Sequence, residues 1–322
     1  MRALRFDGAS LRLMTDHAAP PVTSGETAVR VLMAGICETD LQILQGYMGF
    51  QGILGHEFVG IAESGPLAGE RVVGEINCGC GRCATCLAGV PTHCPHRTVL
   101  GILGRDGAFA ERLSLPLGNL HRVPESVPSE WAVFVEPLAA ACRIVEQCTR
   151  VRDASIVVLG DGRLGNLCAQ VLKRHGGEVL VLGRHEAKLA RLARLGIETD
   201  LATARTPDHR ADLVVDCTGS ASGLAAALQW VRPRGCVVLK TTIAGPHAQS
   251  LAPVVIDEVT LLGSRCGPFL PAIQLLANRE VDVESLLDST WPLAEGLAAI
   301  EAAKTPGAMK VLLRMEPRFA DE

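Results

Sequence analysis

Residues 154–175 constrain the fold of this 322-residue chain more than any other stretch. Residues 154–159 (ASIVVL) are a continuous apolar run that predicts a buried strand, and the apolar run after the motif, to His175, predicts a helix. Between them VLGDGRLG carries the pattern G-x-G-x-x-G at Gly160, Gly162 and Gly165. Here the first glycine makes a tight turn, the second lets the backbone approach a pyrophosphate, and the third lets helix and strand pack closely. A lone match is often only a glycine turn, but this context predicts a dinucleotide-binding site.

Strands and helices alternate after this motif, which predicts a parallel, doubly wound sheet and an α/β fold. The expected strands are residues 178–182, 212–216, 236–239 and 259–262, and the expected helices are residues 186–195 and 222–231. The tail from about Cys266 predicts a helix (271–278), a return strand near Trp291, an alanine-rich helix and a final strand (309–314).

The part of the chain before Val123 has a different sequence pattern. Short β-rich runs at residues 27–33, 58–63 and 71–76 are punctuated by glycine and proline. They predict a compact, irregular β domain, and residues 129–147 then predict a helical stretch.

The composition limits the classes of function. The chain exceeds what one hydrophobic core usually supports, so we expect two domains. A net charge of −4 and 3% aromatic residues argue against nucleic acid, which requires phosphate neutralisation and stacking faces. The N-terminus lacks an apolar run of signal-peptide length, and no stretch approaches the roughly 18 apolar residues of a spanning helix. We therefore expect a soluble, cytoplasmic protein without membrane contact.

Four of the twelve cysteines have the spacing of a metal site, Cys80-x2-Cys83-x2-Cys86-x7-Cys94. Four thiolates in so short a loop can close a tetrahedron around zinc and leave no position for substrate, as in a structural site. The alternative is a chance cluster of reduced thiols. Cys78 is a fifth cysteine in this segment, and the even spacing of Cys80, Cys83 and Cys86 favours Cys80 over it as a ligand.

The stretch from Gly35 to Glu57 contains the ligand types of a second metal site. Thiolate, imidazole and carboxylate all bind zinc, and a catalytic site needs three protein ligands plus an open position. Cys37, His56 and Glu57 supply these types, and Asp40 is a candidate partner for the imidazole. The alternative is that Cys37 is a buried free thiol and His56 a core histidine.

The chain resembles the zinc-containing medium-chain dehydrogenases/reductases, the alcohol dehydrogenase superfamily. The resemblance rests on GICETD, GHE, the four-cysteine lobe, FVEPLA, VLGDGRLG, VDCTGS and the closing MKVLL. It implies a GroES-like β-barrel catalytic domain at residues 1–137 and 266–322, with a structural zinc lobe at about 78–95. It also implies a Rossmann dinucleotide-binding domain at residues 138–265.

The resemblance also implies roles for single residues. Cys37 and His56 are expected to ligate the catalytic zinc, with Glu57 or Glu136 as a further ligand, and Thr39 is expected to bind the substrate hydroxyl. The alternative for Glu136 is a carboxylate that complements the N-terminus of a helix.

Other expectations concern the cofactor and the substrate pocket. The cofactor is expected to contact the glycine motif with Arg163 and Leu164, the nicotinamide to lie beside Thr218, Arg265 and Cys266, and the pyrophosphate to meet Lys310. The alternative for Lys310 is a solvated charge at a strand end. Gln42 stands where related enzymes often carry a proton-relay histidine, so that relay is absent or rerouted. Tyr47, Met48 and Phe50 are expected to line the pocket, although core packing is an alternative for Phe50.

The end of the second strand predicts the cofactor. NAD-preferring folds place an acidic residue about 20 residues after the glycine motif, where it binds the ribose 2′-hydroxyl. Here the strand ends in Gly183, Arg184 and His185. Arginine presents a charged fork to a 2′-phosphate, so we expect a preference for NADP(H), with NAD(H) possible. The alternative is that Arg184 stacks on the adenine of either cofactor.

These observations predict a zinc-dependent oxidoreductase with two zinc ions per chain. It would move a hydride between NADP(H) and a secondary alcohol or polyol, or the corresponding ketone or aldehyde. The alternatives are an NAD-dependent polyol or sugar dehydrogenase, a zinc-free quinone or enoyl reductase, and a catalytically silent nucleotide-binding protein. The resemblance also implies a homodimer or homotetramer.

Overall fold

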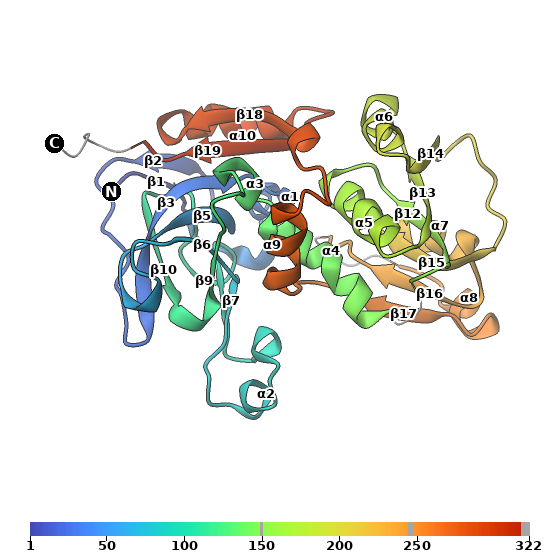
Figure 1. The fold of residues 1–322 in the computed structure, drawn as a ribbon, viewed down its shortest axis with the longest axis horizontal. Helices are drawn as coiled ribbons and strands as arrows, with labels where there is room; N and C mark the ends of the chain where they lie inside the picture. The colour runs from blue at the N-terminus through green and yellow to red at the C-terminus, as the bar shows by residue number, and fades with distance from the viewer. Residues whose placement is uncertain (149–150, 244–247, 317–322) are drawn as a thin grey trace. The chain divides into compact units, whose positions relative to one another are not determined.

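The chain forms two compact units in the computed structural model, which describes residues 1–148, 151–243 and 248–316 (Figure 1). The first unit comprises Met1–Glu136, Leu276–Asn278 and Leu286–Glu322, and the second comprises Pro137–Leu275 and Arg279–Ser285. The first boundary between the units, after Glu136, lies within one residue of the expected boundary at residue 137. The chain re-enters the first unit only at Leu276, later than the expected residue 266. Gly267 explains the shift, because a Cβ there would lie 1.9 Å from the carbonyl oxygen of Ala139, so the segment packs closely on the second unit.

The second unit is built on a parallel sheet with the strand order β14-β13-β12-β15-β16-β17. Numbered along the chain, this is the order 3-2-1-4-5-6 of a doubly wound dinucleotide-binding fold, which confirms the predicted fold class. The strands are β12 (Ser155–Leu159), β13 (Glu178–Gly183), β14 (Glu198–Leu201), β15 (Ala211–Asp216), β16 (Val231–Leu239) and β17 (Thr260–Gly263).

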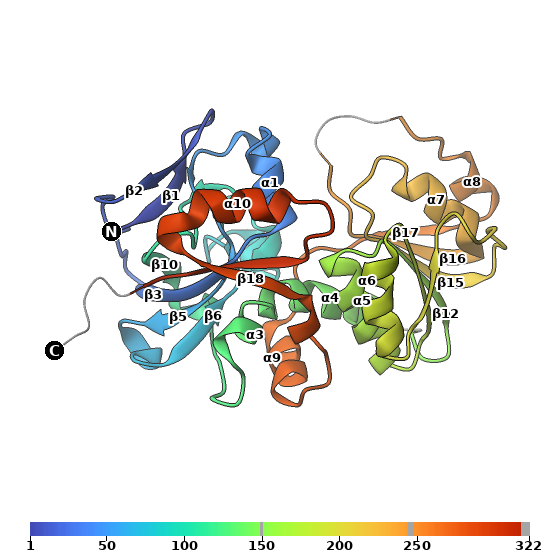
Figure 2. The same cartoon turned by 90° about the horizontal axis from the view of Figure 1, so that it is seen from above.

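Helices cover both faces of this sheet. α5 packs on β12 and β13, α6 packs on β13 and β14, and α7 packs on β15 and β16. Figure 2 shows α5 and α6 on one side of the sheet and α7 and α8 on the other. Because both faces are covered, the inner strands are apolar without alternation, and Val158 and Val214 are fully buried. The helices are α4 (Val135–Gln147), α5 (Arg163–Arg174), α6 (Glu186–Arg194), α7 (Gly223–Trp230), α8 (Ala252–Ile256) and α9 (Phe269–Ala277).

Two elements differ from the sequence prediction. The expected helical stretch over residues 129–147 is interrupted between α3 (Ser129–Ala132) and α4. Pro137 accounts for the break, because proline is tolerated in the first turn of a helix and not in its interior. The strand β14 was not expected, because its sequence ETDL lacks an apolar run. It lies at the sheet edge and pairs only with β13, so it needs no continuous apolar face.

The first unit is an irregular β structure organised around β3. The strand order of its main sheet is β11-β6-β5-β3-β19-β18, with β10 also paired to β3. The smaller sheets are β2-β1-β4 and β7-β8-β9. The strands are β1 (Ala3–Phe6), β2 (Leu11–Met14), β3 (Glu26–Gly35), β4 (Gly52–Ile53), β5 (Glu57–Ala62), β6 (Arg71–Gly74), β7 (Asn77–Cys78), β8 (Thr98–Leu100), β9 (Gly104–Arg105), β10 (Arg112–Pro116), β11 (Leu120–Arg122), β18 (Leu287–Pro292) and β19 (Lys310–Arg314).

The strands β5 and β19 both pair with the end of β3. Gly35 pairs with Glu57 of β5 on one side and with Leu312 of β19 on the other. The helix α1 (Glu38–Ile43) begins directly after β3, and α10 (Gly296–Lys304) packs on β18 and β19. Segments from residues 35, 57 and 310 therefore meet although they lie far apart in the sequence.

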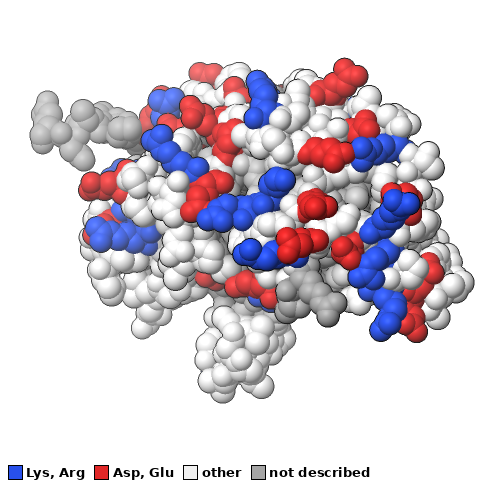
Figure 3. All heavy atoms as spheres, turned by 45° about the vertical axis from the view of Figure 1, so that its right-hand side comes forward, with Lys and Arg blue, Asp and Glu red and all other residues white. Residues whose placement is uncertain are grey.

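The surface agrees with the charge balance of the sequence. Figure 3 shows lysine and arginine side chains interspersed with aspartate and glutamate over the face drawn. Such a face is unlike the continuous basic surface that neutralises nucleic-acid phosphates. Among the helices of the described residues, none combines the length and the apolar character of a membrane span.

Candidate active site and metal centres

The first candidate centre lies where β3 ends and where α1 and β5 begin. Cys37 stands at the N-cap of α1, and its backbone N–H donates to Oδ2 of Asp40 at 2.8 Å. His56 directly precedes β5, and Glu57 is the first residue of that strand. Ligand atoms of Cys37, His56 and Glu57 all lie within 4.8 Å of one another. The structure therefore brings together three of the four residues predicted to hold a catalytic zinc.

Asp40 orients the imidazole of His56. The carboxylate is fully buried, accepts the backbone N–H of Gly55 at 3.1 Å, and lies 3.3 Å from Nδ1 of His56. Nδ1 has no well-aligned hydrogen bond within the described residues, so this contact is mainly electrostatic. Burial alone would lower the pKa of His56, but Asp40 and Cys37 together raise it well above its ordinary value. The carboxylate thus stabilises positive charge on the imidazole, and a metal at Nε2 would take the place of the proton there, as in carboxylate–histidine–zinc arrangements.

The structure places Lys310 against Glu57. Both side chains are 1% exposed, and Nζ of Lys310 donates to Oε2 of Glu57. The ring of Phe134 lies 5.5 Å from the ammonium. This burial contradicts the alternative of a solvated strand-end charge, whereas a contact between Lys310 and the pyrophosphate stays a prediction. A buried ammonium needs a compensating carboxylate, and Glu57 is the group that the strand register provides.

Gly35 makes room for this ion pair. A Cβ at residue 35 would lie 2.6 Å from Oε2 of Glu57 and 2.7 Å from Cγ1 of Val133. A larger residue would displace the carboxylate from both Lys310 and the candidate metal centre. Glu136 lies in the first turn of α4, and the donor cluster formed by described residues contains Glu57 in its place. A ligand role for Glu136 stays a prediction.

The other residues expected around this centre lie partly beside it, partly on the surface and partly in the core. The thiol of Cys37 lies 3.9 Å from the hydroxyl of Thr39, so Thr39 adjoins the candidate metal centre. The amide of Gln42 donates to Glu38 at 3.1 Å, which keeps it on the surface of α1. Met48 is 50% exposed, whereas Phe50 is buried, so the structure favours core packing for Phe50. Tyr47 is half-buried in the turn beside Met48.

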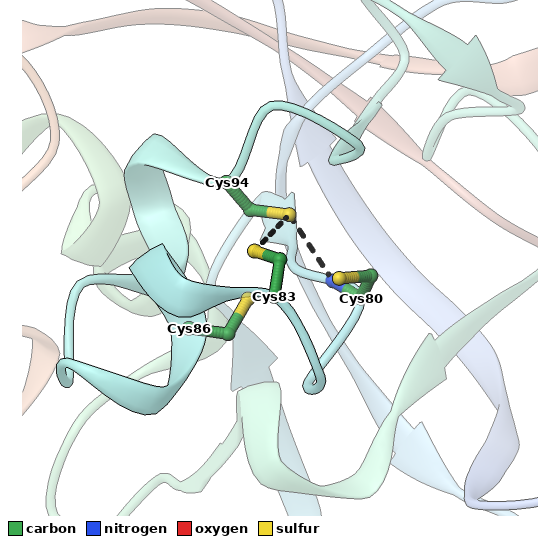
Figure 4. Close-up of side chains that lie close together, drawn as sticks. All are labelled: Cys80, Cys83, Cys86 and Cys94. Atoms are coloured by element: carbon green, nitrogen blue, oxygen red, sulfur yellow. Dashed lines mark hydrogen bonds between the residues drawn. The ribbon is translucent and has the colours of Figure 1, made fainter.

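The second candidate centre is the four-cysteine lobe between β7 and β8 (Figure 4). The side chains of Cys80, Cys83, Cys86 and Cys94 point toward one another, and their sulfurs lie within 4.8 Å. The sulfurs of Cys83 and Cys94 are 3.6 Å apart. A tetrahedron with zinc–sulfur bonds of about 2.3 Å has edges of about 3.8 Å, so this spacing fits the metal.

Backbone N–H groups around the lobe favour thiolates. Sγ of Cys94 accepts the N–H of Cys80 at 3.4 Å and that of His96 at 3.3 Å. Backbone hydrogen bonds from Arg82 and Cys83 lower the pKa of Cys80 to about 6. Burial, in contrast, raises the pKa of Cys86 to about 11. Thiolate is the form that binds zinc, and a coordinating metal deprotonates such a thiol itself, so the donor set fits as well as the spacing. Cys78 lies apart from the cluster, in β7.

The glycine motif occupies the carboxyl edge of the parallel sheet. Gly160 has φ +114°, and a Cβ there would lie 2.6 Å from the carbonyl oxygen of Cys217. A Cβ at Gly165 would lie 2.1 Å from the carbonyl oxygen of Gly160, so the start of α5 packs tightly under the turn. Gly162 is the N-cap of α5 and faces open space, and Arg163 and Leu164 form the first turn behind it. This is the arrangement expected for a pyrophosphate at a helix N-terminus.

The other expected nicotinamide-side residues lie at the same edge. The hydroxyl of Thr218 donates to Oδ1 of Asp216 at 2.8 Å, directly after β15. Lys240, directly after β16, donates to the carbonyl oxygen of Arg265 at 3.1 Å, and Cys266 follows. The carboxyl ends of neighbouring parallel strands therefore carry these residues together.

Sequence reasoning missed Asp161, the residue between the first two glycines of the motif. The residue is 7% exposed, and its side chain reaches the end of β13, where Oδ2 accepts the backbone N–H groups of Arg184 and His185, each at 2.7 Å. The glycine loop thus places an acidic side chain at the end of β13, where the strand itself carries none. An aspartate inside the motif combined with Gly183 was the available signal.

Lys310→Met should lower the free energy of unfolding of the zinc-free protein by about 3–5 kcal/mol, because Glu57 would keep a buried charge without its cation. Chemical denaturation measures the loss. The double variant Glu57→Gln/Lys310→Met should recover most of it, since both charges are gone. Lys304→Met breaks only an exposed pair with Glu301 and should cost less than about 1 kcal/mol. A Lys310→Met protein as stable as its parent would contradict the assignment.

Comparisons with known proteins match both units. The model of the alcohol dehydrogenase GroES-like domain matches residues 23–125, and that of zinc-binding dehydrogenases matches residues 164–278. The 2-dehydro-3-deoxy-L-galactonate 5-dehydrogenase of Pseudoalteromonas atlantica is 30% identical, with 94% of this chain and 95% of that protein aligned.

Two solved structures contain nicotinamide cofactors. The alcohol dehydrogenase rspB of Escherichia coli CFT073, complexed with NADH, has a TM-score of 0.88 and 25% identity, and the alignment covers 98% of this chain and 99% of that one. A Sinorhizobium meliloti 1021 protein, described as a zinc-binding dehydrogenase and bound to NADP, has a TM-score of 0.86 and 26% identity, with coverages of 97% and 98%.

Proposed function

Because the chain belongs to the zinc-type medium-chain alcohol dehydrogenase superfamily, we propose that it is a zinc-dependent oxidoreductase of secondary alcohols or polyols. The reaction converts the alcohol and NADP+ to the ketone, NADPH and a proton, and it runs in either direction. Membership of the family supports the coarser statement, an oxidoreductase that acts on alcohols. Zinc dependence, the cofactor preference and the substrate class are the proposal.

The convergence of Cys37, His56 and Glu57 is the observation that carries the proposal. A thiolate, an imidazole and a carboxylate form a donor set that suits zinc and leaves a position for substrate. Bound there, zinc supplies Lewis-acid polarisation of the substrate oxygen. Asp40 keeps the imidazole in one orientation, and the hydrogen bond from Lys310 holds the carboxylate of Glu57 in place.

Thr39 is the residue that we assign to the substrate hydroxyl. Its hydroxyl adjoins the thiol of Cys37 and can both donate and accept a hydrogen bond. Gln42 carries no titratable proton and is bonded to Glu38, so proton release is assigned to a route that does not use residue 42. The name of the Pseudoalteromonas relative refers to a sugar acid, which supports a polyhydroxylated substrate.

The cofactor proposal is NADP(H), supported by Gly183 and Arg184. The glycine leaves the end of β13 without a side chain of its own, and Arg184 offers a charged fork for a 2′-phosphate. A second candidate is an NAD-dependent polyol or sugar dehydrogenase. Asp161 favours that candidate, because its carboxylate lies at the same strand end.

A screen of secondary alcohols, polyols and sugar acids with both cofactors tests the proposal, with cofactor reduction followed by absorbance. We expect turnover of at least one substrate class, a higher kcat/KM with NADP+ than with NAD+, and two zinc ions per chain by elemental analysis. Cofactor binding without turnover of any alcohol or carbonyl would favour a catalytically silent protein. Turnover by a zinc-free preparation would favour the quinone or enoyl reductases.

A further inference from the structure

Asp161 makes an unusual connection between two segments of the cofactor-binding unit. It follows Gly160, after β12, yet its side chain contacts residues 23 and 24 positions later, at the end of β13. Oδ2 accepts the backbone N–H groups of Arg184 and His185. Nδ1 of His185 lies 3.1 Å from each carboxylate oxygen. A single aspartate thus fixes the turn that follows β13.

The same side chain fills the space above Gly183. A Cβ at residue 183 would lie 2.5 Å from Oδ2 of Asp161 and 2.6 Å from its Cβ. The carboxylate therefore takes the volume that a side chain at residue 183 would occupy. In NAD-binding folds this strand end carries the acidic residue that accepts the ribose 2′-hydroxyl.

The carboxylate is ionised in this environment. Burial opposes the charge, but the backbone N–H and ring of His185 and the N–H of Arg184 lower the pKa of Asp161 below its ordinary value. Each carboxylate oxygen has two lone-pair sites. Oδ2 accepts hydrogen bonds from two backbone N–H groups. Among the described residues, the hydrogen-bond partner of Oδ1 is the ring of His185. Oδ1 can therefore accept a further hydroxyl group.

We propose that Asp161 is the residue that discriminates between the two nicotinamide cofactors, in opposition to Arg184. This inference rests on the proposed function for the existence of a cofactor site. Asp161 favours the ribose 2′-hydroxyl, because Oδ1 accepts it, and disfavours a 2′-phosphate through like-charge repulsion. It also occupies the N–H groups of residues 184 and 185, which would otherwise be donors for that phosphate. Arg184 acts in the opposite direction, so the cofactor ratio reflects a balance between the two residues.

Fragment binding tests the inference without any substrate. Adenosine 2′,5′-bisphosphate and 5′-AMP differ by the 2′-phosphate, and calorimetry gives the dissociation constant of each for the full-length protein. Asp161→Asn should shift the ratio of these constants toward the bisphosphate by about tenfold or more, since one like charge is removed. Arg184→Ala should shift it the other way. Asp208→Asn, an exposed aspartate in the same unit, changes the net charge equally and should leave the ratio unchanged.

Moving the carboxylate from residue 161 to residue 183 distinguishes a role in cofactor specificity from a role in holding the turn. Gly183→Asp alone should disturb the site, because residue 183 has no free volume. Asp161→Gly/Gly183→Asp frees that volume and returns the acid to the strand, so it should restore the parental ratio. If Asp161→Asn weakens both fragments equally and the double variant does not restore the ratio, Asp161 only supports the turn and the inference is wrong.

The outcome for turnover is separate from this test. An unaltered kcat/KM ratio for NAD+ and NADP+ in Asp161→Asn would contradict the inference even if the fragments behaved as expected. A parent protein that binds the fragments but oxidises no alcohol would contradict the proposed function and leave the role of Asp161 standing. A parent protein that binds neither fragment would overturn both.

Discussion

Cys37→Ser should lower kcat/KM by at least about a thousandfold and leave the secondary structure unchanged. The thiolate is one of three converging ligand types, and a serine hydroxyl is a much weaker zinc ligand at neutral pH. Loss of Lewis-acid polarisation removes several kcal/mol of transition-state stabilisation, and each 1.4 kcal/mol is tenfold in rate. Steady-state kinetics with the substrate found in the screen, together with elemental analysis, measures the effect. We expect one zinc per chain to remain.

Cys148→Ser is the matched control, because Cys148 is a half-buried thiol in the other unit and lies outside both metal clusters. It should keep two zinc ions and a kcat/KM within about twofold of the parent. Parental activity in Cys37→Ser would show that the chemistry does not depend on this cluster. Loss of both zinc ions would show that the two centres are not independent.

The sequence predicted the features that depend on neighbouring residues. The G-x-G-x-x-G turn, the apolar strands of the covered sheet and the cysteine spacing are each contained within about 20 residues, so local pattern reveals them. The strand order then follows from alternation of strands and helices together with right-handed crossovers. The edge strand β14 escaped prediction because a strand paired on one side needs no apolar run.

The other features that escaped prediction depend on contacts between distant residues. Lys310 and Glu57 are 253 residues apart and meet only because β19 and β5 flank the end of β3. Asp161 reaches residues 184 and 185 because parallel pairing aligns β12 with β13 in register. A charged residue read from sequence alone defaults to the surface. Its burial becomes evident only when the partner that compensates its charge is placed beside it.

Cys83→Ser should instead affect stability. The lobe between β7 and β8 contains the short helix α2 (Ala84–Leu87), and Leu87 and Val90 are 76% and 40% exposed, so it buries little apolar surface of its own. We therefore expect its order to come largely from a bound metal, whose binding free energy is also folding free energy. We expect loss of one zinc, a midpoint of thermal unfolding lower by about 10 °C, and a free energy of unfolding lower by at least about 3 kcal/mol.

The region in which amide exchange rises distinguishes loss of the structural metal from general destabilisation. Amide exchange should rise within residues 79–95 and stay near the parental level in the parallel sheet of the second unit, because a local opening of the lobe does not expose that core. The catalytic cluster uses other residues, so kcat/KM at 25 °C should stay within about threefold of the parent. Cys78→Ser is the control, because Cys78 lies in β7 outside the tetrad and its loss should leave both zinc ions in place. Retention of two zinc ions by Cys83→Ser, or exchange that rises equally in both units, would mean that the four sulfurs do not hold a structural metal.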